Sequence, residues 1–188
     1  VTVYDGAAAV GTATVDGSGA WALDTSALAN GAHSLTVVLT DSAGNASVPS
    51  SPLVLTIDAS APVAASSLAI SPDTGSSASD KITSATSLLI TGTAEPASTV
   101  TVTWASGPTL TATTSGAGTW STSTGTLTPG TYTMTVTVTD AAGNATSTTM
   151  TVTVDTTAPA APVISSPAAT NSTTPSIAGT GVAGSMLA

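Results

Sequence analysis

The feature that most constrains this chain is a stretch that occurs twice. Residues 34–58 read SLTVVLTDSAGNASVPSSPLVLTID, and residues 133–155 read TMTVTVTDAAGNATSTTMTVTVD. The landmark pairs separated by 99 residues are Trp21 and Trp120, Gly31 and Gly130, Asp41 and Asp140, and Asn45 and Asn144. A period of this length is too long for a solenoid repeat and has the size of one β-sandwich domain. We therefore expect each copy to bury a core of its own.

The repeat divides the chain into one complete module between two partial ones. Residues 1–58 correspond to the back part of one module, residues 59–155 to a complete module, and residues 156–188 to the front part of a third. In the third copy, SIAGTGVAGS at 176–185 matches LITGTAEPAS at 89–98. This division is typical of a tandem array, and it predicts a longer tandem protein or a fibre.

Alternation of apolar and polar residues predicts strands. Residues 131–140 read TYTMTVTVTD, in which every second position is apolar and most of the others are Thr, the pattern of a half-buried strand. Shorter strand-like runs lie at 63–70, 87–92, 99–104, 109–114 and 119–121, between clusters of Gly, Pro, Ser and Asp. About seven short strands without helical periodicity predict an all-β fold. We expect tandem immunoglobulin-like antiparallel β-sandwich modules of just under 100 residues.

Composition argues against several classes of function. The 188 residues carry 10 acidic groups against one Lys, so the formal net charge is −9 and little is present to neutralise nucleic-acid phosphates. Cysteine is absent, which excludes disulfides and Cys-ligated zinc. No apolar run approaches the roughly 20 residues that span a bilayer, so we expect no membrane insertion. Cations are the natural partners of such a surface.

Four aromatic or imidazole side chains have repeated positions. Tyr132 follows the turn LTPG, which predicts a tyrosine corner whose hydroxyl binds an upstream backbone group. His33 holds the equivalent position in the first copy, and without a second His or Cys it is interpreted as a corner residue rather than a metal ligand or catalytic base. Trp21 and Trp120 follow Gly turns and are expected to anchor the cores.

The acidic residues lie in loops and at the ends of predicted strands. Asp58 and Asp155 end the last strand of their modules, while Asp41 and Asp140 open the turns DSAGN and DAAGN. The candidate ligand residues are Asp41, Asp58, Asp73, Asp80, Glu95, Asp140, Asn144 and Asp155. Asp and Asn also form turns for purely local reasons, which is the alternative interpretation of each turn taken alone.

The connectivity of an immunoglobulin-like sandwich brings some of these acids together. Asp58 should face Glu95, Asp140 and Asn144 where the chain enters the second module, because the two loops concerned lie at that end. Asp155 should leave beside Asp73 and Asp80 at the opposite end. Carboxylates without basic partners repel one another, and hard oxygen ligands suit Ca²⁺. We therefore expect calcium at the module junctions.

Three phrases carry a resemblance to a known family. They are SPDTGSSASDKITSATSLLITGTAEPASTVTV, GTWSTSTGTLTPGTYTMTVTVTDAAGNAT and TVTVDTTAPAAPV. The chain resembles the bacterial immunoglobulin-like tandem repeats of giant secreted adhesins and biofilm-associated surface proteins. That resemblance implies an extracellular or cell-surface stalk, exported by a dedicated secretion system and stiffened by calcium at its junctions. One departure is that Val182 stands where the second module has Glu95.

The leading functional hypothesis is a non-catalytic spacer that holds an adhesive ligand site, located elsewhere in the full protein, away from the cell. Its partners would be neighbouring modules of the same chain or adjacent subunits. No Ser/His/Asp set, HExxH motif or phosphate-binding glycine loop is present, so we expect no enzyme. Two alternatives stay open. One is a glycan-binding module, and the other is a self-assembling filament in which residues 156–188 of one subunit complete the sandwich of the next.

Overall fold

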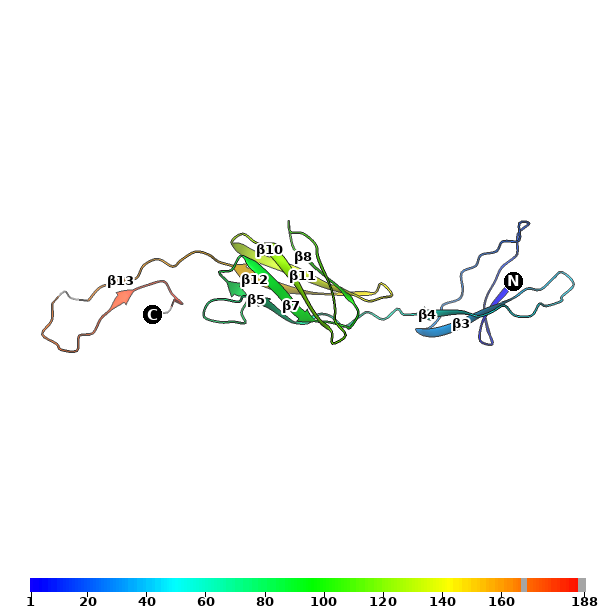
Figure 1. The fold of residues 1–188 in the computed structure, drawn as a ribbon, viewed down its shortest axis with the longest axis horizontal. Helices are drawn as coiled ribbons and strands as arrows, with labels where there is room; N and C mark the ends of the chain where they lie inside the picture. The colour runs from blue at the N-terminus through cyan, green and yellow to red at the C-terminus, as the bar shows by residue number, and fades with distance from the viewer. Residues whose placement is uncertain (167–168, 186–188) are drawn as a thin grey trace.

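The computed structural model describes residues 1–166 and 169–185, and within them it contains strands, turns and irregular chain but no helix. Three parts follow one another along the long axis (Figure 1). The first part is blue to cyan, the second green to yellow, and the third orange to red. The prediction of an all-β fold is confirmed.

The second part is a sandwich of two sheets. One sheet has the order β10-β7-β5 and the other has the order β6-β12-β11-β8-β9. The strands are β5 (Ser66–Ser71), β6 (Ile82–Thr83), β7 (Ser87–Thr93), β8 (Thr99–Thr103), β9 (Leu110–Thr113), β10 (Thr119–Thr126), β11 (Gly130–Thr139) and β12 (Ala145–Val154). Neighbouring strands are antiparallel except β6 and β12, which run parallel. The strand predicted at 119–121 is longer than expected because its pairing with β7 continues past the apolar residues.

The sandwich core follows from period-two alternation. In β11, Met134, Val136 and Val138 are fully buried, and the Thr residues between them point away from the core. β12 pairs with β11 over ten positions, so Val152 and Val154 join the same cluster. The facing sheet contributes Leu88, Ile90 and Ile70 to it. Each fully buried Val, Leu or Ile stabilises the fold by about 1.5–3 kcal/mol relative to exposure.

The first part forms a single sheet of order β2-β1-β3-β4. Its strands are β1 (Thr2–Asp5), β2 (Ala8–Thr12), β3 (Gly31–Val38) and β4 (Leu53–Ile57). Only Val3, Val10 and Leu35 form a buried cluster there. The sheet lacks the opposing strands that close the second part, so several residues of its inward face stay exposed.

The expectation that both repeated Trp residues anchor cores is wrong for Trp21. Trp120 is 4% exposed, whereas Trp21 is 42% exposed. Trp120 lies on β10 opposite Gly92 of β7, and its ring packs over that glycine. No strand equivalent to β7 lies beside Trp21, and the chain around it forms no strand. A residue at a core position of the repeat is therefore buried only where another strand covers it.

The third part contains one pair of short antiparallel strands, β13 (Val163–Ile164) and β14 (Gly179–Thr180). Val163 pairs with Thr180 as Ser66 of the second part pairs with Thr93. Residues 167–168 and 186–188 lie outside the described residues. The pairing is that of the front half of a sandwich.

Candidate functional site

The junction between the first and second parts is fixed by hydrogen bonds from both sides. The Asn144 side-chain amide Nδ2 donates to the backbone carbonyl of Asp58 at 3.0 Å. From the first part, Asn30 Oδ1 accepts from the Ala59 backbone N at 3.0 Å, and Asn30 Nδ2 donates to Ser60 Oγ at 2.6 Å. The connecting segment is therefore bound to the module it leaves and to the module it enters.

Asn144 is oriented by the turn that it closes. Asp140 Oδ1 accepts the backbone N–H groups of Ala142 and Asn144, both at 2.9 Å, and Asp140 Oδ2 accepts the Asn144 amide at 2.9 Å. Gly143 takes a φ of 96°, in the left-handed region that favours glycine. The hydrogen bond from Asn144 is the largest cause that holds the pKa of Asp140 below its ordinary value. The turn is a preorganised carboxylate–amide unit at the junction.

The first part contains the same unit. Asp41 Oδ1 accepts the backbone N–H groups of Ala43 at 2.9 Å and Asn45 at 2.8 Å, and Asp41 Oδ2 accepts the Asn45 amide at 2.8 Å. The pKa of Asp41 is likewise lowered, with the Asn45 amide as the largest cause. Asp41 thus accepts hydrogen bonds within its own turn, as expected for a residue that forms a turn for local reasons.

At the other end of the second part, Asp155 lies beside the loop that contains Asp73 and Asp80. The Asp155 backbone N donates to the carbonyl of Thr83 at 2.9 Å, because β12 runs parallel to β6 there. Asp73 Oδ2 accepts the Lys81 backbone N at 3.0 Å, and Asp80 Oδ1 accepts the Ile82 backbone N at 3.0 Å. Asp73 Oδ1 is buried and has no hydrogen-bond partner.

Glu95 lies in the turn between β7 and β8. Its backbone carbonyl accepts from Ser98 Oγ at 2.6 Å and Thr114 Oγ1 at 2.7 Å, so the main chain of the turn is firmly held. Across residues 1–166 and 169–185, no three Asp, Glu, His or Cys side chains lie together as a ready metal-binding group. The structure thus joins Asp58 to Asn144 and Asn144 to Asp140, but it does not gather Glu95 and the carboxylates of Asp58 and Asp140 into one group.

Two oxygen atoms at the first junction accept hydrogen bonds from the same amide nitrogen. The carbonyl of Asp58 and Oδ2 of Asp140 are both held within hydrogen-bond distance of one atom, Asn144 Nδ2. Both are oxygen ligands of the kind Ca²⁺ takes. The amide nitrogen of Asn144 carries two protons and cannot ligate a cation, so calcium would require this side chain to turn its oxygen inward.

The corner residues take the roles that their positions predict. Tyr132 Oη donates to the carbonyl of Thr128 at 2.7 Å, which confirms the tyrosine corner. His33 Nε2 lies 2.8 Å from the equivalent carbonyl, that of Ala29. His33 Nδ1 also lies 2.6 Å from Asp5 Oδ2, a partner that the sequence interpretation did not include. Trp104 holds the Asp5 position in the second copy, so the pairing of acid with His is specific to the first.

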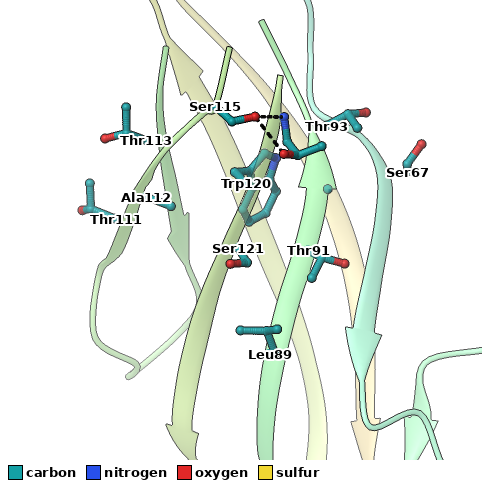
Figure 2. A pocket seen from close by; sticks show the side chains of 12 residues that line it. Ser67, Leu89, Thr91, Thr93, Thr111, Ala112, Thr113, Ser115, Trp120 and Ser121 are labelled. Atoms are coloured by element: carbon teal, nitrogen blue, oxygen red, sulfur yellow. Dashed lines mark hydrogen bonds between the residues drawn. The ribbon is translucent and has the colours of Figure 1, made fainter. Parts of the chain in front are cut away.

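A shallow groove of about 750 Å³ lies between β9 and the sheet that contains β7 and β10 (Figure 2). Most of its lining residues are Ser or Thr, including Thr91 and Thr93 on one side and Thr111 and Thr113 on the other, with Trp120 between them. Since Trp120 is almost wholly buried, it offers no stacking face for a sugar ring. None of the predicted ligand residues lines this groove.

Sequence analysis missed Asn30 and the donor role of Asn144. Asn30 precedes Gly31 and is typical of a turn, and only its hydrogen bonds to Ala59 and Ser60 show that it holds the connection. The second copy has Pro129 at the equivalent position, so the repeat itself gave no signal. The described residues contain no helix that is long and apolar enough to cross a membrane.

Comparison with known proteins identifies one matching family and several similar solved structures. The family described as Bacterial Ig-like domain matches residues 1–59 and again residues 60–156. No curated protein sequence matches the chain. A solved structure of a tetra-tandem repeat in the extending region of a large adhesion protein shares 26% identity over 88% of this chain and 43% of its own, with a TM-score of 0.42.

A second solved structure concerns host cell surface retention of a 1.5-MDa bacterial ice-binding adhesin. It shares 28% identity over 66% of this chain and 41% of its own, with a TM-score of 0.32. The chain spans less than half the length of either solved protein. Two consecutive family matches cover most of its residues, and the chain therefore belongs to the bacterial Ig-like domain family.

Proposed function

We propose that this chain is a non-catalytic structural repeat, a spacer in the stalk of a large extracellular bacterial adhesin. The observation that carries the proposal is the hydrogen bond from Asn144 to the carbonyl of Asp58, which ties one module to the next where they follow end to end. A spacer must transmit orientation from one module to the next, and a connection held from both sides does so. The adhesive ligand would bind elsewhere in the full protein.

The spacer role also suits the chemistry of the chain. The single histidine is engaged by Asp5 and Ala29 at a strand corner, where it holds the backbone. The Thr-rich outer face of β11 and β12 keeps an antiparallel sheet soluble without charged side chains. Asn30 and Pro62 restrict the connecting segment further, through side-chain hydrogen bonds and a fixed φ respectively.

Calcium stiffening of the junctions is part of the proposal. At the first junction the ligands would come from Asp58, Glu95, Asp140 and Asn144, and at the second from Asp73, Asp80 and Asp155. When bound, the ion would replace repulsion among carboxylates by shared coordination. The unpartnered Oδ1 of Asp73 and the two oxygens that converge on Asn144 support this assignment. Asp41 would serve the same purpose only where another module precedes it.

Small-angle scattering and calorimetry test the proposal together. We expect calcium to bind with measurable heat. Because calcium reduces hinging at the junction, the maximum dimension of the molecule should be longer, or its distribution narrower, in calcium than in chelator. Asp58→Ala should abolish the effect at the first junction only, and Asp155→Ala at the second. If the maximum dimension does not change and no heat of binding is measured, calcium does not stiffen the junctions. If the junction is flexible under all conditions, the spacer role itself is contradicted.

A further inference from the structure

Asn30 is the one asparagine of the chain that a glycine follows. The other asparagines, Asn45, Asn144 and Asn171, precede Ala, Ala and Ser. The backbone nitrogen of the next residue can attack an asparagine side chain, because the attack closes a five-membered ring. A side chain on that next residue hinders the approach, and glycine has none. The pair of Asn30 and Gly31 is therefore the most reactive of the four.

The structure leaves the reacting groups open to solvent. Asn30 and Gly31 are both exposed, and Gly31 is the first residue of β3, where the ladder with β4 ends. Gly31 has a φ of 134°, and no atom lies within 4 Å of the position where a Cβ would stand. Residues at the end of a strand leave their ladder more readily than those in its middle. Local opening at this strand end therefore frees the Gly31 nitrogen to react.

The complete module exposes the same position. Pro129 and Gly130, which correspond to Asn30 and Gly31 by repeat position, are both exposed in the second part. The position therefore lies on the surface even where two sheets close the sandwich. Proline carries no side-chain amide, so the second module has no counterpart of the reaction. The chemistry is specific to the first module.

Two hydrogen bonds hold the Asn30 side chain against the segment that leaves the first part. Asn30 Oδ1 accepts from the Ala59 backbone N at 3.0 Å, and Asn30 Nδ2 donates to Ser60 Oγ at 2.6 Å. Ring closure expels Nδ2, so the bond to Ser60 must break during the reaction. The two bonds therefore slow the attack. Its rate depends on how often the connecting segment releases Asn30.

We propose that Asn30 is a site of spontaneous deamidation that loosens the connection between the first and second modules. The Gly31 nitrogen bonds to Asn30 Cγ, the bond from Cγ to Nδ2 breaks, and ammonia leaves with the proton that the Gly31 nitrogen gives up. Water then opens the resulting succinimide at either carbonyl, which yields aspartate or isoaspartate. Water is the only co-reactant, and no oxidation state changes. This modification goes beyond the spacer role.

Either product changes what the connecting segment contacts. Both products lack the Nδ2 donor to Ser60, and both add a carboxylate close to Asp58, whose Oδ1 already accepts from the Ser60 backbone N at 3.0 Å. A chain with one Lys and a net charge of −9 offers little to neutralise the added charge. Isoaspartate also routes the main chain through Cβ and Cγ, which displaces the acceptor that holds Ala59. The segment then depends on the bond from Asn144 to Asp58.

Peptide mapping of the full chain by mass spectrometry tests the proposal. In folded protein kept at mildly alkaline pH, Asn30 should convert to a mixture of aspartate and isoaspartate. Asn45, Asn144 and Asn171 should stay amides and are controls within the same molecule. Conversion should be slower at mildly acidic pH, because the attacking nitrogen must lose a proton. Residual dipolar couplings of the converted chain should show more independent alignment of the two modules than in fresh protein.

Ser60→Ala tests whether the connecting segment sets the rate. Loss of the hydrogen bond to Nδ2 should raise the rate of conversion in folded protein roughly two- to tenfold. Ser50→Ala is the matched control, because Ser50 is an exposed serine that binds the backbone of β3 at Val37 and does not bind Asn30. It should convert at the wild-type rate. In denaturant all three proteins should convert at one common, faster rate.

Three results would overturn the proposal. If Asn30 stays an amide in the folded chain while the denatured chain converts, the fold blocks the reaction. If Ser60→Ala and the wild type convert equally fast when folded, the connecting segment does not control it. If the relative alignment of the modules is the same after conversion, the modification does not loosen the junction. All measurements are made in chelator, so failure of calcium stiffening leaves deamidation intact, and the absence of deamidation leaves the spacer role intact.

Discussion

Asn144 donates one amide hydrogen bond to the side chain of Asp140 within its own turn and another to the backbone carbonyl of Asp58, which lies 86 residues away in sequence. One side chain thereby closes a local turn and joins two modules. Asn45 closes the equivalent turn with Asp41 in the first copy. Comparison of Asn45 with Asn144 therefore distinguishes the role of this residue in the turn from its role at the junction.

Asn144→Ala should increase the freedom of the first module relative to the second. Both Asn144→Ala and Asn45→Ala remove a turn hydrogen bond worth about 0.5–1.5 kcal/mol, but only the former also releases Asp58. Residual dipolar couplings measured in chelator should report two independently aligned modules in Asn144→Ala. Asn45→Ala is the control and should keep the wild-type relative alignment. Equal behaviour of the two variants would mean that the amide does not hold the junction.

His33 should titrate above its ordinary pKa of 6.5. Both ring nitrogens face acceptors, Asp5 Oδ2 and the Ala29 carbonyl, so the doubly protonated ring satisfies both, and the hydrogen bond to Asp5 is the largest cause of the raised pKa. The stabilisation is fully present below pH 6.5 and is lost as pH rises through the folded-state pKa. The pKa of Asp5 is lowered, mainly by the hydrogen bond to His33. The stabilisation that ionised Asp5 provides is therefore present above pH 3.8 and is lost as the pH falls through its folded-state pKa.

An NMR titration of the only histidine in the chain checks this prediction without an assignment problem. His33→Tyr is the matched variant, because the second copy uses Tyr132 for the same corner bond. It should remove the pH dependence of the first module near neutrality while preserving the corner. A His33 pKa at or below 6.5 would contradict the doubly protonated pair.

Equivalent apolar truncations should have unequal costs in the two copies. Val138→Ala removes two methyl groups from a fully buried site and should lower the free energy of unfolding of the second part by roughly 2–3 kcal/mol. Leu39→Ala, at the repeat-equivalent position, should change stability by no more than about 0.5 kcal/mol under dilute, monomeric conditions, because the side chain is already half exposed. Equilibrium denaturation measures both. A large loss for Leu39→Ala in a monomer would show that the first part is covered by its own chain.

Gly92→Ala should destabilise the second part by about 1–3 kcal/mol. A Cβ at Gly92 would lie 2.8 Å from the Trp120 ring and 2.9 Å from a methyl of Leu68, and both are packed side chains in the sandwich. Gly116→Ala is the control, because no atom lies within 4 Å of its Cβ position. Thermal unfolding followed by Trp fluorescence should show a lower transition for Gly92→Ala only. No difference between the variants would mean that the Trp120 site can relax without cost.

The sequence by itself determined the repeat, the strands and the local turns. Period-two alternation in residues 131–140 predicts a strand with one apolar face, and Asp-x-x-x-Asn turns form from their own hydrogen bonds. The corner at Tyr132 was predictable for the same reason, since its hydroxyl reaches only four residues back. These features depend on interactions between near neighbours in the chain.

Tertiary structure decided which of these patterns are buried and which side chains meet across modules. Trp21 and Trp120 occupy the same repeat position, yet only Trp120 has a strand beside it, so burial is a property of the neighbouring strand rather than of the residue. Asn144 carried the sequence signal of a cation ligand, but in the folded chain its amide protons bind the carbonyl of Asp58. Sequence specifies the donors and acceptors, and only the packing of distant segments determines which of them lie within bonding distance.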